Sequence, residues 1–355
     1  MSQPQNTSSQ SKYSNPILTP KPVSHDSGKT SGFREVLEYK SQLAFLVIGI
    51  FGFIGLLKFI QEFNAIRQWM KLNHEAPDYG WAEFSDFKIT LISAGISLVS
   101  NQIMNLITWP FFYAFCKEKN DEDLRKSKTL KACNSLYKGV YFISVTVWGF
   151  YVLKDTDYLP WTLLGKASYD NFNVGYPSVA WPAGMREYYL GTMGYHVHQL
   201  FQHALHPMRN DFVEMFLHHC VTLVLYGGSY MVGMTDAGSV IMFLHDWADV
   251  FTSFVRCFTE TTITSISVVS AIGMTLSWFY TRIIVFPAII YYTCFQRDIY
   301  NGAGFIADKF LGSFLVILFI LHCYWFVILL KSIQKFVKVG KAEDLQQRVV
   351  AKKTK

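Results

Sequence analysis

Charged residues are scarce in this sequence. Only 16% of its 355 residues are Asp, Glu, Lys or Arg, whereas 51% are hydrophobic. A soluble domain of this length carries about 25% charged residues. The shortage of charge, together with long apolar runs, excludes an ordinary soluble fold and indicates a protein that crosses a membrane several times.

Three further features are missing. The six cysteines show no CxxC spacing and lie mostly within or beside apolar runs, which favours small buried residues over a disulfide or metal framework. Period-two alternation is absent, so a membrane barrel is not expected. The chain does not begin with the basic, apolar and cleavage regions of a signal peptide, so we expect no cleaved leader.

Apolar runs that approach the roughly 20 residues needed to cross a bilayer occur along the whole chain. They predict an all-α integral membrane protein with about eight transmembrane helices. The fourth run is the least apolar, because it is rich in histidine. The expected spans are 41–60, 88–114, 136–154, 187–207, 214–234, 238–258, 266–292 and 309–331.

The distribution of basic residues predicts the orientation. The segment "KEKNDEDLRKSKTLKAC", which starts at Lys117, and the tail after the last helix are both basic. Since cytosolic loops carry an excess of Lys and Arg, we expect both segments and both termini in the cytosol. Residues 1–32 are polar, without apolar periodicity, and predict a disordered tail. The final "KKTK" resembles a dilysine signal for endoplasmic-reticulum retrieval; the alternative is a basic tail that meets anionic lipid.

Ionisable residues gather in the apolar stretch "FLHHCVTLVLYGGSYMVGMTDAGSVIMFLHDWAD", residues 216–249. Such groups are expensive inside a membrane, so they are functional candidates by default. Two helices that turn near Thr235 and Asp236 would bring His219 and Asp249 to within about 5 Å of the same depth, at 1.5 Å per residue.

The spacing also sets which side chains share a helix face. His245 and Asp246 share one broad face with Asp249, and His218 shares a face with Thr222. The hairpin can therefore bring two imidazoles against two carboxylates, an arrangement that prepares a base or a nucleophile. The alternative is a purely structural role, in which these groups form interhelical hydrogen bonds that hold the bundle together. Such bonds contribute only about 0.6 kcal/mol each on average, which is little in return for burying so many ionisable groups.

A metal site is a second alternative, because seven of the ten histidines crowd one region. Membrane di-iron enzymes use repeated HxxHH blocks. Here Phe216 stands three residues before His219, so the histidine pair is not part of such a block. We therefore expect no metal.

The order and spacing of these polar residues resemble the signature of ceramide synthases, the longevity-assurance members of the TLC-domain family. "NVGYP" at 173–177, "YTRIIVFP" around Arg282, and "LHCYW" with His322 and Trp325 are similar to other family segments. The resemblance covers roughly 80–337 and is of the plant- and fungal-like form without a homeobox insert. The residues on the signature are Arg209, Asp211, Phe212, His218, His219, Thr222, Ser229, Tyr230, Gly238, His245, Asp246 and Asp249.

The resemblance implies a six-helix TLC domain over 128–337. Two helices and a basic cytosolic loop would precede it within 33–127, and a basic tail would follow at 338–355. It implies an acyltransferase of the endoplasmic-reticulum membrane that moves a fatty acyl group from acyl-CoA to the amine of sphinganine or a similar long-chain base. Acyl-CoA is then a co-substrate, with no other cofactor. Membrane lipids surround the protein, homo- or hetero-oligomers are compatible with it, and no nucleic acid is expected.

The resemblance also suggests roles for individual residues. One histidine of the pair would carry the acyl group or act as the base, and which one is left open. The expected catalytic residues are His218, His219, Asp246 and Asp249. The expected substrate-binding or supporting residues are Thr222, Ser229, Tyr230, His245, Arg209, Arg282, His322 and Trp325. The basic residues that could attract CoA phosphates, or simply follow the positive-inside rule, are Arg125, Lys126, Lys128, Lys131, Arg209 and Arg256.

Three positions near the expected site depart from the family pattern, besides Tyr137 and Lys138, which stand where Trp–Arg or Trp–Lys is usual. Asp236 stands where an Arg is common, Ser253 where a Glu is common, and Arg256 where a Lys is usual. These departures bear on substrate choice more than on chemistry. The rival functions are a non-catalytic TLC protein that handles lipid or assists membrane-protein insertion, an acyltransferase with another acceptor, and a metal-dependent lipid oxidase.

Overall fold

The computed structural model describes most of the central part of the chain. The tails, the loop with Arg209 and Asp211, and most of the predicted span 41–60 lie outside the described residues. The chain divides into two compact units, Met1–Ile54 and Gly55–Lys355, and the helix bundle belongs to the second. The described residues are 53–69, 72, 82–176, 180–205, 212–296 and 307–339.

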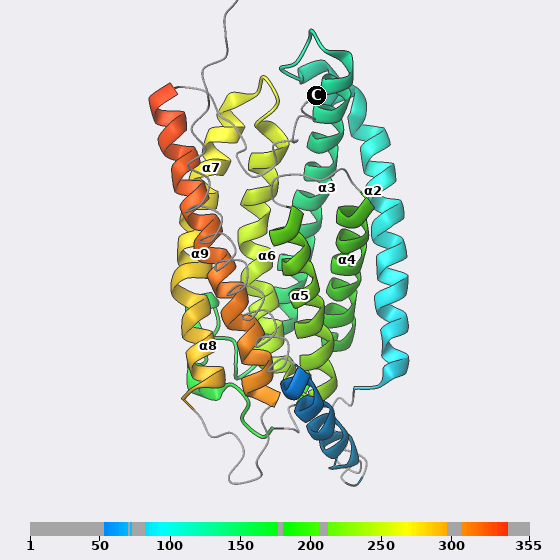
Figure 1. The fold of residues 1–355 in the computed structure, drawn as a ribbon, viewed down its shortest axis with the longest axis vertical. Coiled ribbons are helices and arrows are strands. Elements are labelled where there is room, and N and C mark those ends of the chain that lie inside the picture. The colour runs from blue at the N-terminus through cyan, green and yellow to red at the C-terminus, as the bar shows by residue number, and fades with distance from the viewer. Residues whose placement is uncertain are drawn as a thin grey trace, which may run out of the picture. The chain divides into compact units, whose positions relative to one another are not determined.

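Long helices make up nearly all of the described region (Figure 1), and it contains no β-strand. The all-α prediction is confirmed, and the predicted spans from 88–114 onward each coincide with helical structure. Residues 53–69 are helical as well. The long helices are α2 (Phe87–Phe115), α3 (Glu122–Leu153), α4 (Met185–Leu205), α5 (Phe212–Val232), α6 (Thr235–Phe258), α7 (Thr264–Trp278), α8 (Phe286–Cys294) and α9 (Ala307–Val339).

Five helical segments of the described region are long and apolar enough to span a bilayer: Phe84–Phe115, Glu122–Leu153, Phe212–Val232, Thr264–Cys294 and Ala307–Lys335. Their outward side chains are apolar and exposed, as lipid contact requires; Leu106 on α2 is 79% exposed. α4 and α6 carry more polar residues and bury many of them. The chain is therefore a multi-pass membrane protein.

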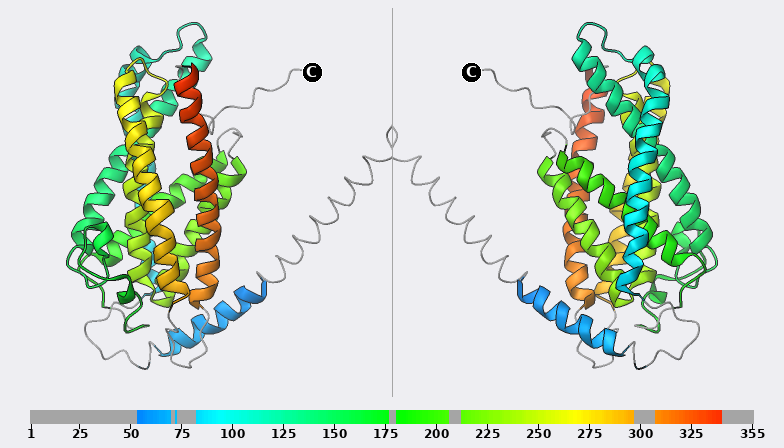
Figure 2. Two further views of the ribbon diagram at one scale, coloured as in Figure 1. Left: turned by 90° about the vertical axis from the view of Figure 1, so that its left-hand side faces the viewer. Right: turned by 90° about the vertical axis from the view of Figure 1, so that its right-hand side faces the viewer.

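The helices pack in a definite order. α3 lies along α6, α2 along α4, and α9 along α5 and α8 (Figures 1 and 2). α2 meets α4 through small and polar groups: the hydroxyl of Thr90 donates to the carbonyl of Leu190 over 3.2 Å, and that of Ser93 to the carbonyl of Gly191 over 2.7 Å. Gly194 permits this approach, since a Cβ there would stand 2.5 Å from the Thr90 carbonyl. Small residues and interhelical hydrogen bonds are typical of helix contacts in membranes.

α3 begins earlier than predicted. The hydropathy pattern starts the span at 136, but the helix starts at Glu122, where the Asp121 side chain accepts the Leu124 N–H over 3.0 Å. Glu122 and Asp123 in the first turn favour a helix N-terminus electrostatically. The predicted basic loop is therefore wrong over 122–133, because hydropathy detects apolar runs and not the polar turns that extend them.

The hairpin between α5 and α6 turns at Gly233 and Met234, slightly before the predicted position. Gly233 has φ +82°, which residues with a side chain rarely adopt. Asp236 lies in the first turn of α6 and is only 1% exposed. Its Oδ2 accepts the backbone N–H of Asn173 over 2.5 Å. The departure at Asp236 thus has a structural explanation: this carboxylate anchors the "NVGYP" segment to α6.

We expect Asp236→Ala to lower the free energy of unfolding by about 1–3 kcal/mol, because the buried Asn173 N–H would lose its acceptor. The midpoint of thermal unfolding in detergent would report the loss. Asp236→Asn keeps an acceptor oxygen and is the matched control, with a smaller expected change. Equal midpoints for Asp236→Ala and the wild type would contradict this anchoring role.

The penultimate helix is not uniform. A π-helical segment, Phe279–Val285, separates α7 from α8. Pro287, the second residue after this segment, has no N–H to donate, so the hydrogen-bond ladder is already interrupted here. π-helical turns occur frequently at functional sites. This one carries Arg282, which is only 2% exposed.

Candidate active site

Two cavities meet in the middle of the bundle. The first is mainly apolar and is lined by side chains of α4, α5, α6, α8 and α9; its space free of atoms, counted with the part open to the outside, is about 810 Å³. The second is polar and is lined by α3, α4, α5, α6, the α7–α8 helix and α9; its space counted in the same way is about 1320 Å³. The residues that line both are His196, His218 and Asp249. The two cavities therefore share a wall built from α4, α5 and α6.

The predicted catalytic residues lie around this shared wall. His218 and Asp249 border both cavities, Asp246 borders the apolar one and His219 the polar one. Asp246 is 2% exposed, and its Oδ2 has no hydrogen-bond partner in the structure, as is true of Nδ1 of both histidines. Buried polar atoms normally have partners, and exceptions often mark catalytic groups or sites of bound water or ligand.

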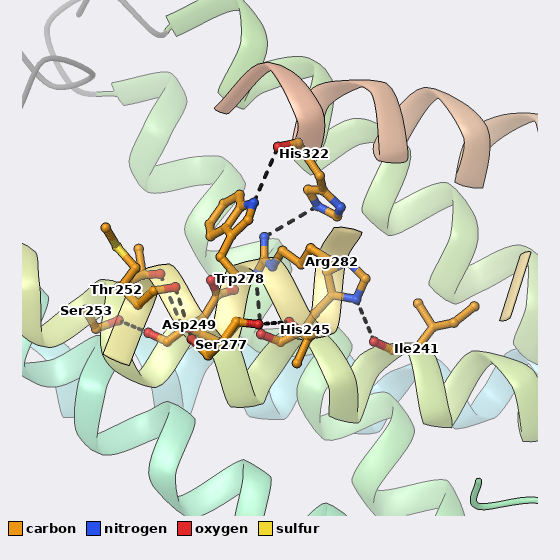
Figure 3. Close-up of polar contacts among 12 residues, drawn as sticks. Ile241, His245, Asp249, Thr252, Ser253, Ser277, Trp278, Arg282 and His322 are labelled. Carbon is orange, nitrogen blue, oxygen red and sulfur yellow. Dashed lines mark hydrogen bonds and ion pairs between the residues drawn. The ribbon is translucent and has the colours of Figure 1, made fainter. Parts of the chain in front are cut away.

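Arg282 organises the α6 side of the site (Figure 3). Its Nη2 lies 2.6 Å from Asp249 Oδ1 and 3.3 Å from the carbonyl O of His245. Its Nη1 faces Nε2 of His322 at 3.4 Å, and the guanidinium lies over the Trp278 ring, 4.1 Å from its centre. Arginine can hold several partners at fixed angles because its donors are arranged in a rigid fork.

The carboxylates are thus paired differently from the sequence prediction. Asp249 is paired with Arg282, and no hydrogen bond joins His218 or His219 to Asp246 or Asp249 in the described structure. The hairpin does bring His218 and Asp249 to one cavity wall, as their spacing predicts. Asp249 is therefore oriented by an arginine from a distant helix, which leaves His218 accessible from both cavities.

His245 lines the apolar cavity one helical turn before Asp249, and His322 lies beside His245. The Nδ1–H of His245 donates to the Ile241 carbonyl over 2.6 Å, which leaves Nε2 without a partner. The rings of His245 and His322 are 4.9 Å apart. His322 is fully buried, and its carbonyl accepts the Trp278 indole N–H over 3.4 Å. Both histidines therefore support the arginine and its segment.

The remaining predicted residues are distributed unevenly. Trp325 lines the polar cavity, with its ring 5.4 Å from that of His218. Thr222 and Ser229 line the apolar cavity, and Ser229 Oγ lies 2.5 Å from the hydroxyl of Tyr189. Tyr230 lines neither cavity: its hydroxyl donates over 2.7 Å to Asp86, which ties α5 to the start of α2.

The basic residues predicted to attract phosphates fall into two groups. Lys131 and Arg256 line the polar cavity, as does Ser253. The others bond elsewhere or lie outside the described residues. Arg125 donates to the Tyr113 carbonyl, Lys126 pairs with Glu122, Lys128 pairs with Glu260, and Arg209 is outside the described residues.

Sequence reasoning missed two residues of the cavities. Lys138 lines the polar cavity from α3, and His196 lines both from α4. Lys138 follows Lys131 by two helical turns and so shares its face, a spacing that could have identified it had the segment been taken as helical. For His196 the signal is the histidine-rich composition of the fourth predicted span, which favours a polar cavity but does not single out this residue among the histidines of α4.

Among the described residues, no group of three or more His, Cys, Asp or Glu side chains is arranged to hold a metal ion. The crowding of histidines along the sequence therefore does not correspond to a cluster of ligands in this part of the chain. The histidines of α5 contact other aromatic rings: that of His219 lies 5.5 Å from His218 and 5.8 Å from His203.

Comparison with known proteins supports the resemblance. Ceramide synthase 4 of Bos taurus is 31% identical over 229 residues, which cover 64% of this chain and 56% of the relative. ASC1-like protein 3 of Oryza sativa subsp. japonica is 26% identical over 267 residues, 71% of this chain and 90% of the relative. Ceramide synthase LOH2 of Arabidopsis thaliana is 26% identical over 226 residues, 62% of this chain and 74% of the relative.

The predicted similarity to ceramide synthases is thereby confirmed, although the chain spans little more than half the length of the mammalian relatives that it matches. A family model, the TLC domain, matches residues 131–331. This match includes α4 to α8, among them the two helices of the hairpin, α5 and α6. It covers more than half of the chain. The protein belongs to the TLC-domain family.

Proposed function

We propose that this protein is a sphingoid base N-acyltransferase, a ceramide synthase, which moves a fatty acyl group from acyl-CoA to the amine of a long-chain base. One observation carries the proposal: His218 and Asp249 lie on the wall shared by a polar cavity and an apolar one. An acyl-CoA divides in the same way, into an anionic nucleotide and an apolar chain. Its thioester, which joins the two, would lie beside His218.

Two routes are consistent with an imidazole at this point. In the first, neutral His218 attacks the thioester carbonyl, the C–S bond breaks, and the proton lost by the imidazole leaves with CoA as its thiol. The neutral amine then attacks the acyl-imidazole, the C–N bond forms, and the amine's proton passes to the imidazole as it is released. In the second, His218 takes a proton from the amine as the amine attacks the thioester; the C–S bond breaks and His218 passes that proton to CoA, which leaves as a thiol. Asp249, held by Arg282, and Asp246 would orient the reacting groups and balance their charge.

The polar cavity is suited to the CoA moiety. Lys131 and Lys138 contribute positive charge from α3, and Arg256 contributes it from α6. Ammonium and guanidinium groups are the usual partners of phosphates, through charge-assisted hydrogen bonds. The nucleotide would enter through this cavity, while the chain of the acyl group would extend between α5, α6 and α9.

We expect Lys138→Ala to raise KM for acyl-CoA about tenfold with little change in kcat, because a phosphate contact far from the thioester contributes mainly to binding. Steady-state kinetics at saturating sphinganine would measure both constants. Lys126→Ala is the matched control, since Lys126 is exposed and pairs with Glu122. Equal KM values for Lys138→Ala and Lys126→Ala would contradict a phosphate contact at Lys138.

The proposal includes a location. The end of the bundle with Lys131 and Arg256 would face the cytosol, where acyl-CoA is present and where basic loops are expected. Both termini would then be cytosolic, and the "KKTK" ending could act in retrieval to the endoplasmic reticulum. A reporter fused to either terminus should be accessible to protease in intact microsomes, and Lys352→Ser/Lys353→Ser should redistribute the protein.

The direct test is amide formation by the purified protein. Wild type would be supplied with sphinganine and a series of acyl-CoAs of increasing length, and ceramide would be measured by mass spectrometry. Ceramide at one or more chain lengths is the expected result. No product at any length, with acyl-CoA still bound, would favour the lipid-handling alternative; a product only with another acceptor would favour a different acyltransferase.

A further inference from the structure

The apolar cavity contains an unexpected polar pair. Thr293, near the end of α8, and Asp308, at the start of α9, both line it. Thr293 is 4% exposed and Asp308 is 2% exposed. Oγ1 of Thr293 and Oδ1 of Asp308 have no hydrogen-bond partner in the structure. Neither residue belongs to the catalytic group, and a buried polar atom without a partner is costly in an apolar wall.

The Asp308 carboxylate is held in place by Lys309. Lys309 donates to the carbonyl of Cys294, the last residue of α8, and its Nζ lies 3.0 Å from Asp308 Oδ2. α8 and α9 approach closely beside it, since a Cβ on Gly312 would lie 2.8 Å from the Cys294 sulfur. Lys309 compensates the charge on one side of the Asp308 carboxylate. The remaining oxygen, Oδ1, therefore suits a neutral donor, such as a hydroxyl, better than a cation.

The cavity extends well away from the reacting centre. Ala237 and Asp249 both line it, and they are about 18 Å apart along α6 at 1.5 Å per residue. This length is comparable to half of the ~30 Å hydrocarbon core, which is the depth that the lipid chains of one leaflet span. A long acyl chain whose thioester lies beside His218 and Asp249 can therefore extend toward the ends of α8 and α9, where the polar pair lies.

We propose that Thr293 and Asp308 form a subsite for a hydroxyl group at the ω end of a long acyl chain. The hydroxyl would donate to Asp308 Oδ1 and accept from the Thr293 hydroxyl, so that both unpaired atoms gain partners. A chain that ends in methyl would leave them unpaired. Sites built to bond a substrate hydroxyl discriminate strongly against analogues that lack it. The inference rests on the proposed function, since it assumes that the acyl chain occupies the apolar cavity.

The first experiment measures binding without turnover. Purified wild type, with no sphingoid base present, would be titrated with saturated acyl-CoAs, each compared with its ω-hydroxy counterpart of equal chain length. We expect the ω-hydroxy form to bind about tenfold more tightly, the factor given by one additional satisfied buried hydrogen bond. The preference should peak at one chain length, because only there does the hydroxyl reach Thr293 and Asp308.

Variants locate the effect. Thr293→Val removes the hydroxyl at nearly constant volume and should reduce the preference to about onefold to threefold, because the ω-hydroxy chain loses a donor and the unsubstituted chain no longer leaves the Thr293 hydroxyl unpaired. Thr293→Ser keeps the hydroxyl and should retain the preference. Asp308→Asn keeps an acceptor and should retain part of it. These outcomes together would support the subsite.

Equal binding of the two chain types at every length by the wild type would overturn the subsite, and so would a preference that survives Thr293→Val unchanged. Ceramide formation with sphinganine, measured on the same preparation, separates this inference from the proposed function. Product without an ω-hydroxyl preference refutes only the subsite. An ω-hydroxyl preference without product refutes only the transferase activity and leaves the subsite supported.

Discussion

His218→Ala is expected to lower the rate of ceramide formation by about 10²–10⁴-fold, the range lost with a positioned base. The reason is its position: the imidazole borders both cavities, whereas the neighbouring His219 borders only the polar one. The fold should tolerate the change, because no hydrogen bond is assigned to His218 Nδ1 in the structure. Mass-spectrometric ceramide assays and the thermal unfolding midpoint would be measured together.

His219→Ala is the matched control for this experiment. Since His219 touches His203 and His218 but not the apolar cavity, its loss should reduce the rate far less, by about tenfold. A larger loss for His219→Ala than for His218→Ala would reverse the two roles. Incubation of wild type with acyl-CoA alone, followed by peptide mass spectrometry, would separate nucleophile from base: only the nucleophilic route leaves an acyl group on the peptide with His218.

Local features of the sequence predicted much of the fold. Hydropathy located the helices because each membrane span must bury its own backbone polar groups within one continuous segment. The turn between α5 and α6 followed from the break in the apolar runs. Helical rise predicts that His219 and Asp249 lie near one depth, and both line the polar cavity. The polar N-terminal turns of α3 escaped detection, since Asp121 and Glu122 stabilise a helix through capping and charge instead of apolarity.

The spacing of polar residues indicated several side chains that line the two cavities, but not how those side chains pair. The spacing of His218 and Asp249 indicates that they can approach, yet Asp249 bonds to Arg282, which is 33 residues away on another helix. Helix rotation and packing determine that contact, and hydropathy fixes neither. Asp236 illustrates the same limit: its partner Asn173 belongs to a segment 63 residues away that has no periodic pattern.

The second large effect is expected at Arg282. Arg282→Met should lower the free energy of unfolding by roughly 3 kcal/mol, because it leaves the charge of Asp249 uncompensated. The Arg282 side chain is 3% exposed, but that of Asp249 is 27% exposed to the cavities, so the loss should fall at the lower end of the range for buried pairs. We also expect ceramide formation to fall at least about 10²-fold, since Asp249 would no longer be held at the wall shared by the two cavities. Thermal unfolding in detergent and the ceramide assay would measure the two losses.

A double variant separates orientation from charge balance. Arg282→Met/Asp249→Asn removes both charges and should recover most of the stability, since the unpaired carboxylate is gone. Activity should remain low, because the amide is neither charged nor held by the guanidinium fork. Arg282→Lys keeps the charge without the fork that joins Asp249, His245 and His322, so it should be stable yet impaired. Full activity of Arg282→Lys would mean that Arg282 only neutralises Asp249; impaired activity in a stable protein would assign it the orientation of that carboxylate.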